Sequence, residues 1–190
     1  MEKFSDVIVK NYPKTASLED SLQVVLRPLL KEDEPRLVEY FQALTPQDRL
    51  CLQENFADPQ VVEDWIYNLD YDDVLPLIAL YNGRIVGQAT LHFSPIGWTR
   101  HQGEVHLTID PRYRAKGLGT LLLQNLIDIA GLIGLEQLTG EIPPLLDKAF
   151  ILFEKLGFDK VEVLKGFAMD QEGRESDIVL MLKTLQKPKS

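Results

Sequence analysis

The sequence is poor in the residues that build disulfides and membrane spans. Its 190 residues include one cysteine, Cys51, which excludes a disulfide within the chain. No apolar run of 18 residues occurs, so a transmembrane helix of ordinary length is excluded. The first residues lack the basic region and apolar core of a secretory signal peptide. We therefore expect a cytoplasmic protein without a membrane partner, in which Cys51 is a small buried or helix-face residue.

Basic residues are scarce relative to acidic ones. The chain has 20 Lys and Arg against 29 Asp and Glu, a formal net charge of -9 at pH 7. Such a charge repels nucleic acids and anionic membranes at long range. We expect no nucleic-acid partner and a preference for cationic substrates, although the same charge could serve solubility alone.

Histidine is the third scarce residue, with only His92, His101 and His106. Their spacing matches no metal-binding motif, so we expect polar strand or loop histidines and no metal site. The remaining composition, 45% apolar and 26% charged, is typical of a globular protein with a full core. A chain of this length most often forms one domain.

Hydrophobic periodicity and turn residues divide the chain into strands and helices. Two β-rich runs, 74–81 and 84–93, flank Asn82-Gly83, which predicts a hairpin with a two-residue turn. An apolar stripe along residues 118–133 predicts a helix that ends before Gly134. The other expected strands are 23–26, 103–109, 136–142, 160–167 and 176–182, and the other expected helices begin near Lys31 and Pro46 and span 59–69 and 146–156.

The ends of the chain carry weaker patterns. Residues 1–20 have no strong period and are expected to form an irregular or loosely strand-like N-terminal extension. Residues 185–190 are expected to be a frayed tail. No repeat or low-complexity linker interrupts the chain, so residues 21–184 are predicted to form a single domain.

The run Asp110–Gly119 joins an expected strand to a strongly helical segment. The first turn of a helix has amide groups without intrahelical partners, and the helix dipole adds partial positive charge there. Gly117 and Gly119 permit a tight turn and the close approach of an anion, while the basic side chains within residues 112–116 add local positive charge. The run predicts a phosphate cradle. A glycine-containing turn with solvated basic residues is the alternative.

Two familiar phosphate loops do not fit this run. The chain has no Gly-Lys-Ser/Thr of a P-loop, and Leu122 stands where a dinucleotide fingerprint needs its third glycine. Instead, the pattern Arg114-x-x-Gly117-x-Gly119 after a strand resembles the acyl-CoA pyrophosphate loop of the GNAT superfamily of N-acetyltransferases. Residues 149–158, Ala-x-x-Leu-Phe-Glu-Lys-Leu-Gly-Phe, resemble the end of that family's fourth helix. The order of the expected elements also resembles the family's fold over most of the chain.

The resemblance implies a fold and a donor substrate. The fold class is α/β (α+β), with a mixed, mostly antiparallel sheet of about six to seven strands, flanked by helices and splayed between its fourth and fifth strands. Acetyl-CoA would lay its pantetheine beside residues 107–109 like an added strand, and its pyrophosphate on the amides of residues 114–120. The residues that the resemblance assigns to acetyl-CoA are Leu107, Thr108, Ile109, Arg114, Ala115, Lys116, Gly117, Leu118, Gly119, Thr120 and Phe153.

Direct transfer to an amine requires a neutral amine. A lysine-like amine with a pKa near 10.4 is neutral about once in 2,500 molecules at pH 7, which is equivalent to roughly 4.6 kcal/mol. Glu104 is the first candidate for the base, since its offset from Arg114 resembles that of a glutamate in bacterial protein-lysine acetyltransferases of this superfamily. His106, on the same strand face, and Glu141, near the end of the neighbouring strand, are weaker candidates. A solvated strand-end carboxylate is the alternative interpretation of Glu104.

Two positions depart from the family pattern. Phe153 replaces a tyrosine whose hydroxyl can protonate or hydrogen-bond the leaving thiolate, and Leu146 replaces a common asparagine. Turnover is still expected, because water can protonate a thiolate. We predict an N-acetyltransferase that acts on a primary amine, a small molecule or a protein lysine, through a ternary complex. A noncatalytic acyl-CoA sensor or interaction module is the alternative, and a homodimer is compatible with this superfamily.

Overall fold

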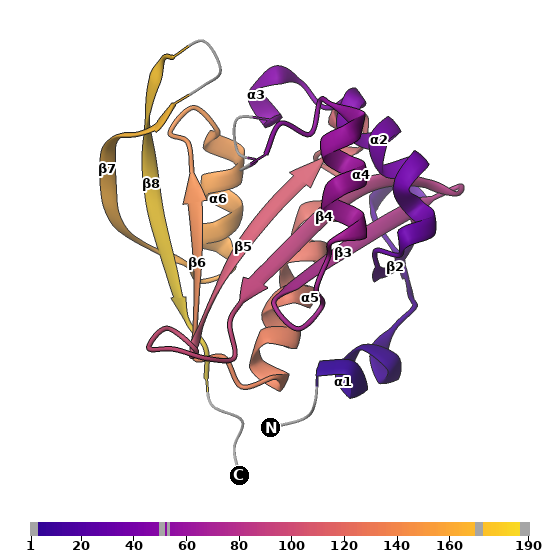
Figure 1. Cartoon of the computed structure of the whole chain (residues 1–190), viewed down its shortest axis with the longest axis horizontal. Helices are drawn as coiled ribbons and strands as arrows, with labels where there is room; N and C mark the ends of the chain where they lie inside the picture. The colour runs from indigo at the N-terminus through magenta and orange to yellow at the C-terminus, as the bar shows by residue number, and fades with distance from the viewer. Residues whose placement is uncertain (1–3, 50–51, 53, 170–172, 187–190) are drawn as a thin grey trace.

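A computed structural model describes residues 4–49, 52, 54–169 and 173–186; Cys51, expected to be buried or on a helix face, lies outside them. One eight-stranded sheet forms the centre of the molecule, in the order β1-β2-β3-β4-β5-β6-β8-β7 (Figure 1). Its neighbouring strands are antiparallel except β5 and β6, which are parallel. The strands are β1 (Lys14–Ser17), β2 (Gln23–Pro28), β3 (Val74–Tyr81), β4 (Arg84–Phe93), β5 (Gln102–Ile109), β6 (Gln137–Ile142), β7 (Asp159–Met169) and β8 (Glu175–Thr184). The helices are α1 (Phe4–Asn11), α2 (Glu34–Ala43), α3 (Pro46–Arg49), α4 (Pro59–Tyr67), α5 (Leu118–Leu132) and α6 (Asp147–Lys155), with short 3-10 helices η1 (Glu19–Ser21), η2 (Lys31–Asp33) and η3 (Pro111–Tyr113).

The sheet has one strand more than the sequence predicted. The additional strand is β1, which pairs with β2 from Lys14 opposite Leu26 to Ser17 opposite Gln23. It lies within residues 1–20, where we expected irregular or loosely strand-like chain and did not expect helix α1. A four-residue strand of polar and small residues has no periodicity to detect. It forms because the edge of β2 offers it hydrogen-bonding partners.

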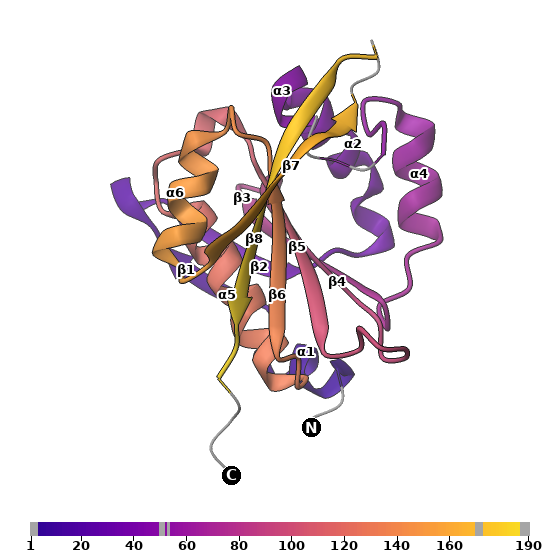
Figure 2. The same ribbon diagram turned by 90° about the vertical axis from the view of Figure 1, so that its left-hand side faces the viewer.

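Helices cover both faces of the sheet. Figure 2 shows α5 and α6 on one face and α2 and α4 on the other. The apolar stripe predicted along residues 118–133 is confirmed, because Leu122 and Leu126 of α5 are 0% exposed. Full burial of a leucine side chain contributes roughly 1.5–3 kcal/mol. On the opposite face, α2 and α4 pack around Phe41 and Ile66 in a second apolar cluster. No helix among the described residues is both long and apolar enough to cross a membrane.

The predicted hairpin between residues 74–81 and 84–93 is confirmed. Its turn residues Asn82 and Gly83 have φ values of 49° and 77°, the left-handed geometry that a two-residue hairpin requires. β4 is consequently held between β3 and β5 in the middle of the sheet. Alternate side chains of β4 point toward α2 and α4.

β5 and β6 diverge part-way along their length, as expected for the fourth and fifth strands of the predicted sheet. Their ladder joins Gln102–Glu104 to Gln137–Thr139, and no further pairing occurs between them. Past the ladder, the ring of Phe153 on α6 packs against Gly140 on β6, so closely that any Cβ at Gly140 would collide with it. The glycine is therefore required by the close approach of the ring, and the edge of β5 is left open.

Candidate active site

Polar side chains line the face of β4 and β5 that points toward α2 and α4. The strand register places Gln88 opposite Thr108, Thr90 opposite His106 and His92 opposite Glu104. Since alternate residues of a strand share a face, these residues form one continuous patch. We call it the polar strip; its members are Gln88, Thr90, His92, Glu104, His106 and Thr108.

Glu104 and His106 are in contact within the polar strip. His106 Nε2 lies 3.0 Å from Glu104 Oε1, but the angle is not that of an aligned hydrogen bond. The Glu104 side chain is 31% exposed and the His106 side chain is 15% exposed, so the pair is partly shielded from water. The neighbouring His106 imidazole lowers the pKa of Glu104 from its ordinary value, against the opposing effect of burial. The carboxylate therefore stays ionised well below neutral pH.

Glu141 lies on the neighbouring strand β6, two residues beyond Thr139, which is paired with Glu104. Partial burial, followed by the negative charge of Glu104, raises the pKa of Glu141 above its ordinary value. The structure thus brings the three predicted catalytic candidates to one end of the polar strip. Two of them touch, and the third interacts with them through its charge.

His92 is a member of this cluster that the sequence reasoning left out. Its ring stands edge-on to the ring of His106, with 5.0 Å between centroids. Burial, and then the neighbouring His106, lower the pKa of His92 to about 4, so its imidazole is neutral at pH 7. The predicted hairpin places His92 opposite Val74 of β3, and only the register between β4 and β5 brings it opposite Glu104, so no local pattern in the sequence indicated it.

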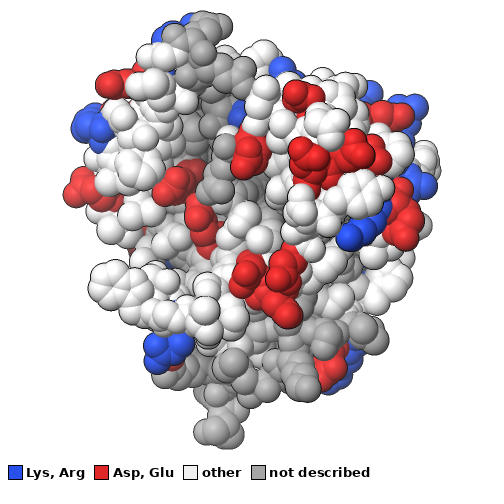
Figure 3. Space-filling view, in the orientation of Figure 1, with Lys and Arg blue, Asp and Glu red and all other residues white. Residues whose placement is uncertain are grey.

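A pocket of about 570 Å³, including the solvent at its mouth, lies between the polar strip and the helical face. Its aromatic walls are Phe41, Phe56 and Trp65. Its floor includes His106, together with Leu107 and Thr108 of β5. Figure 3, which looks onto this face, shows Asp and Glu gathered over its middle and Lys and Arg mainly toward its rim. A cationic group would be attracted to this face.

The predicted phosphate cradle lies at the start of α5. Gly117 caps the helix with φ of 82°, and Ala115 also has a left-handed φ of 56°. The helical hydrogen bonds start when the Leu121 amide donates to the Gly117 carbonyl at 3.0 Å. The amides of residues 118–120 precede that bond and have no intrahelical partner, so they are available to an anion. A Cβ added at Gly119 would lie 3.0 Å from the Leu152 side chain, which would have to shift to admit it.

The basic side chains of this loop are paired with carboxylates. Arg112 Nη2 lies 2.6 Å from Asp110 Oδ2, and Lys116 Nζ lies 2.5 Å from Asp20 Oδ2. We expected these residues to supply free positive charge, whereas their charge is already partly neutralised. An anion at this loop would be bound chiefly by backbone amides.

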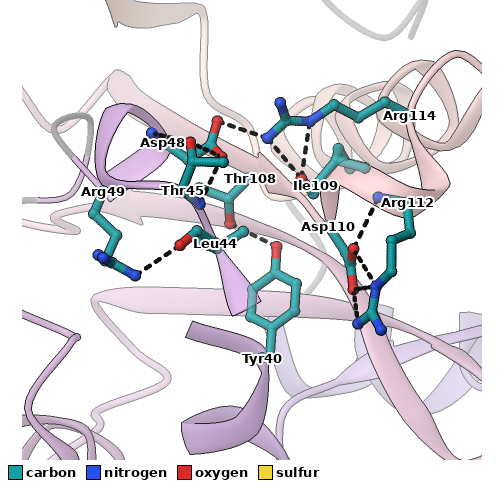
Figure 4. Close-up of polar contacts among 10 residues, drawn as sticks. All are labelled: Tyr40, Leu44, Thr45, Asp48, Arg49, Thr108, Ile109, Asp110, Arg112 and Arg114. Atoms are coloured by element: carbon teal, nitrogen blue, oxygen red, sulfur yellow. Dashed lines mark hydrogen bonds and ion pairs between the residues drawn. The ribbon is translucent and has the colours of Figure 1, made fainter. Parts of the chain in front are cut away.

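Arg114 connects the loop to helix α3, as Figure 4 shows. Its Nη2 lies 2.6 Å from Asp48 Oδ1, and its Nε and Nη2 each donate to the Ile109 carbonyl at 3.1 Å. The other oxygen of Asp48 accepts hydrogen bonds from the amide and hydroxyl of Thr45, which caps α3. Beside this group, the buried Tyr40 hydroxyl donates to Thr108 Oγ1 at 2.8 Å and ties α2 to β5.

The open edge of β5 offers backbone groups to a ligand. The Asp110 amide donates to the Val86 carbonyl of β4 at 3.1 Å. Because backbone groups alternate along a strand, those of Ile109 and of Leu107 point the other way, into the gap that β6 has left. The Ile109 carbonyl already accepts from Arg114, so the Ile109 amide and the backbone groups of Leu107 are the ones that face the gap. Residues 107–109 therefore present a strand edge beside the phosphate cradle.

Phe153 and Leu146 occupy the two positions that depart from the family pattern. Phe153 is 4% exposed, and its ring lies 4.8 Å from that of Phe158. Leu146 precedes α6 and makes no side-chain capping hydrogen bond. Neither side chain offers a polar group to the gap. Among the described residues, no group of three or more His, Cys, Asp or Glu is arranged to hold a metal ion.

The model of the Acetyltransferase (GNAT) family matches residues 37–158, which is well over half of the chain. The chain belongs to this family. The match includes the polar strip, the phosphate cradle and Phe153. The fold expected from the sequence is confirmed as that of a GNAT protein.

The curated relatives cover a smaller part of the chain. The [ribosomal protein bS18]-alanine N-acetyltransferase of Escherichia coli K12 is 32% identical over 77 residues, 40% of this chain and 52% of the relative. The chain thus spans about half the length of the curated relatives it matches.

Solved structures resemble the chain over most of its length. A ribosomal-protein-alanine N-acetyltransferase from Brucella melitensis has a TM-score of 0.71 and 25% identity, covering 84% of this chain and 99% of that one. A Salmonella typhimurium protein solved with its cofactor acetyl-CoA has a TM-score of 0.70 and 21% identity. The similarity covers 88% of this chain and 96% of that one. At that identity the second similarity concerns the fold alone.

Proposed function

We propose that this GNAT protein transfers an acetyl group from acetyl-CoA to a primary amine within a ternary complex. The observation that carries the proposal is the open edge of β5 beside the phosphate cradle. Residues 107–109 offer backbone groups to the pantetheine amides, and the amides of residues 118–120 offer donors to the pyrophosphate. These two requirements of one extended donor are met by adjacent parts of the chain.

The proposed donor fits the local geometry. The left-handed conformations of Ala115 and Gly117 turn successive amides toward one side, which is the arrangement of an anion-binding concavity. Without a Cβ, Gly119 allows close backbone approach, and its amide belongs to the free first turn. The pairing of the basic side chains with carboxylates makes these backbone donors the principal phosphate contacts.

The proposed reaction needs a base and a correctly placed amine. The neutral amine nitrogen attacks the thioester carbonyl carbon, the carbon–sulfur bond breaks, and CoA departs as a thiolate. The new amide nitrogen releases its extra proton to water, and the thiolate takes a proton from water. Glu104 is our first candidate to accept the proton from the incoming ammonium, directly or through water. His106 contacts it, and Glu141 is the competing carboxylate, since its raised pKa makes it the better proton acceptor near neutral pH.

The acceptor class is supported by charge and by the names of relatives. Acidic side chains gather on the face that holds the pocket, which favours a cationic amine (Figure 3). The relatives named for ribosomal-protein alanine support a protein amine, either an N-terminal amine or a lysine, beside a small-molecule amine.

The test combines two measurements on the purified protein. Calorimetry measures acetyl-CoA binding, and a thiol reagent follows free CoA during incubation with a panel of small amines, lysine peptides and peptides with a free N-terminus. We expect saturable binding and amine-dependent thiol release. Absence of acetyl-CoA binding would overturn the proposal entirely.

The alternative is a noncatalytic acyl-CoA sensor. It is motivated by Phe153, which is buried against Gly140 and Phe158 and carries no hydroxyl to meet a leaving thiolate. Tight acetyl-CoA binding without thiol release across the whole panel would favour the sensor. Turnover that is lost in Glu104→Gln, with acetyl-CoA affinity retained, would favour the enzyme.

A further inference from the structure

Gln88 is the one member of the polar strip whose buried oxygen has no partner. Its side chain lies on the pocket floor and is only 6% exposed. The amide nitrogen donates to Thr90 Oγ1 at 3.2 Å, which holds the carboxamide plane in place. The carboxamide oxygen Oε1 makes no hydrogen bond. A buried polar atom left in this state costs about 1–3 kcal/mol, so a group that donates to it from the pocket would recover that free energy.

The surroundings of Gln88 limit what such a group can be. Phe41, Phe56 and Trp65 form the walls above it, so the ligand portion must be apolar or flat. Gln88 Oε1 can only accept a hydrogen bond, so the ligand must carry an O–H or N–H donor at its inner end. The same pocket is lined by Leu107 and Thr108, next to the open edge where the pantetheine is proposed to lie.

The register sets the distance between the two ends of the ligand. Gln88 lies two residues along β4 from Thr90, whose cross-strand partner is His106. Two residues of strand correspond to roughly 7 Å. An amine that reacts beside His106, on the side that faces Glu104, can therefore reach Gln88 only if a spacer about as long as an aromatic ring separates its nitrogen from the donor.

We propose that Gln88 determines acceptor specificity, and that the acceptor is an amine bearing a flat apolar spacer with a hydrogen-bond donor at its far end. This rests on the proposed acetyltransferase function and names the substrate class of the same site. The spacer fills the aromatic pocket, and its terminal O–H or N–H donates to Gln88 Oε1. The reacting amine remains at the end of the polar strip that holds Glu104.

Two amines of matched shape test the inference directly. Tyramine carries a phenol donor at the far end of its ring, and phenethylamine lacks it. The chain has two tryptophans, and Trp98 is 90% exposed and outside the pocket. The Trp98→Phe variant therefore leaves Trp65, a wall of the pocket, as the only tryptophan. Its emission, excited at a wavelength that the two amines do not absorb, reports binding without any need for turnover.

We expect tyramine to bind the Trp98→Phe protein roughly tenfold more tightly than phenethylamine. Adding Gln88→Met, which keeps a similar volume but removes the amide oxygen, should bring the two affinities together. Retained binding of phenethylamine by that variant shows that the pocket is still folded. The matched control is Gln124→Met, on the exposed side of α5, which should keep the preference for tyramine.

The inference is overturned if the two amines bind equally in the Trp98→Phe protein, if the preference survives Gln88→Met, or if neither amine changes Trp65 emission. Acetylation of other amines in those cases would leave the proposed function intact. Conversely, a Gln88-dependent preference without release of CoA thiol would leave the pocket assignment standing and remove the proposed function.

Discussion

The two sides of the splayed strand β5 are built from different kinds of groups. On the side proposed for the cofactor, the groups proposed to bind it are backbone groups of residues 107–109 and 114–120, and the nearby basic side chains are paired with carboxylates. On the acceptor side, the polar strip consists of side chains. Two of their buried atoms, Gln88 Oε1 and His106 Nε2, make no aligned hydrogen bond.

This difference separates general binding from selectivity. Backbone groups at a helix start recognise any phosphate, and their arrangement depends only on where the chain can turn. Side chains set across two strands can be changed one at a time, and each change alters which acceptor fits. We therefore propose that the cofactor side provides general binding of the donor and that the acceptor side decides which amine reacts.

The largest expected effect lies on the acceptor side. Glu104→Gln keeps the shape of the side chain and removes the base, so we expect kcat to fall by about 10²–10⁴-fold. Calorimetry should show unchanged acetyl-CoA affinity, because the cofactor side has lost nothing. A fall in acetyl-CoA affinity of similar size would mean that the two sides are not separate.

Glu141→Gln is the matched variant for this experiment, and the pH profile distinguishes the two carboxylates. The neighbouring His106 lowers the pKa of Glu104 below its ordinary value of 4.5, so loss of its base form should reduce kcat only below that pH. Burial raises the pKa of Glu141 above 4.5, so if Glu141 is the base, kcat should begin to fall at a higher pH. An acidic limb above pH 4.5 that disappears in Glu141→Gln would transfer the role to Glu141.

The second effect is expected on the cofactor side. In Gly117→Val, a β-branched residue is forced to φ of 82° at the phosphate cradle. We expect acetyl-CoA affinity to fall about 30-fold, the equivalent of about 2 kcal/mol. Gly83→Val is the control, because Gly83 has φ of 77°, has open space around it and lies in the β3–β4 turn. Both variants should lose similar stability in urea, and equal acetyl-CoA affinity in both would count against the cradle.

Much of the fold could be predicted from local sequence. The Asn82-Gly83 turn and the apolar stripe of residues 118–133 each carry their signal within a short window, and both predictions are confirmed. Residues 14–17 could not be predicted as a strand, because their pairing depends on the free edge of β2 and not on their own period. The additional strand, β1, therefore depends on tertiary pairing.

The candidate site divides in the same way. The phosphate cradle could be predicted because its glycines and helix start are adjacent in the chain, and its role stays a prediction. Glu104 and His106 were named as candidates, whereas His92 and Gln88 were not, since their place in the site follows from the register between β4 and β5. The ion pair between Arg114 and Asp48 joins residues 66 positions apart (114 minus 48), and no local pattern indicates it.

The third effect concerns stability and belongs to the acceptor side. Burial and the neighbouring His106 lower the pKa of His92 from 6.5 to about 4. Between these values the unfolded chain binds a proton at this position and the folded chain does not, so stability falls as the pH drops from about 6.5 to about 4. The groups that face His92 are His106 and Glu104, and Glu104 titrates below its ordinary value of 4.5.

Urea unfolding should therefore give a smaller free energy of unfolding at pH 5 than at pH 7. His92→Gln should reduce this difference by about 1 kcal/mol, after discounting for partial exposure. His101→Gln, which changes a histidine outside the polar strip, is the control and should retain the wild-type loss. An identical pH dependence in wild type and His92→Gln would show that His92 accepts a proton in the folded state as readily as in the unfolded one.

The smallest expected effect tests whether the Asp20 carboxylate weakens acetyl-CoA binding on the cofactor side. Asp20 lies 2.5 Å from Lys116 and places a negative charge beside the proposed pyrophosphate position. Asp20→Asn keeps a residue type that tolerates the φ of 57° at this site and removes the charge. We expect acetyl-CoA to bind about twofold to threefold more tightly at low salt, with the gain vanishing as salt screens it. Asp177→Asn, which removes a carboxylate charge paired with Lys165 on β7 and is far from the cradle in the sheet order, should change nothing. Weaker binding in Asp20→Asn would mean that the carboxylate holds Lys116 in position for the phosphate, and the cofactor side would then depend on side chains as the acceptor side does.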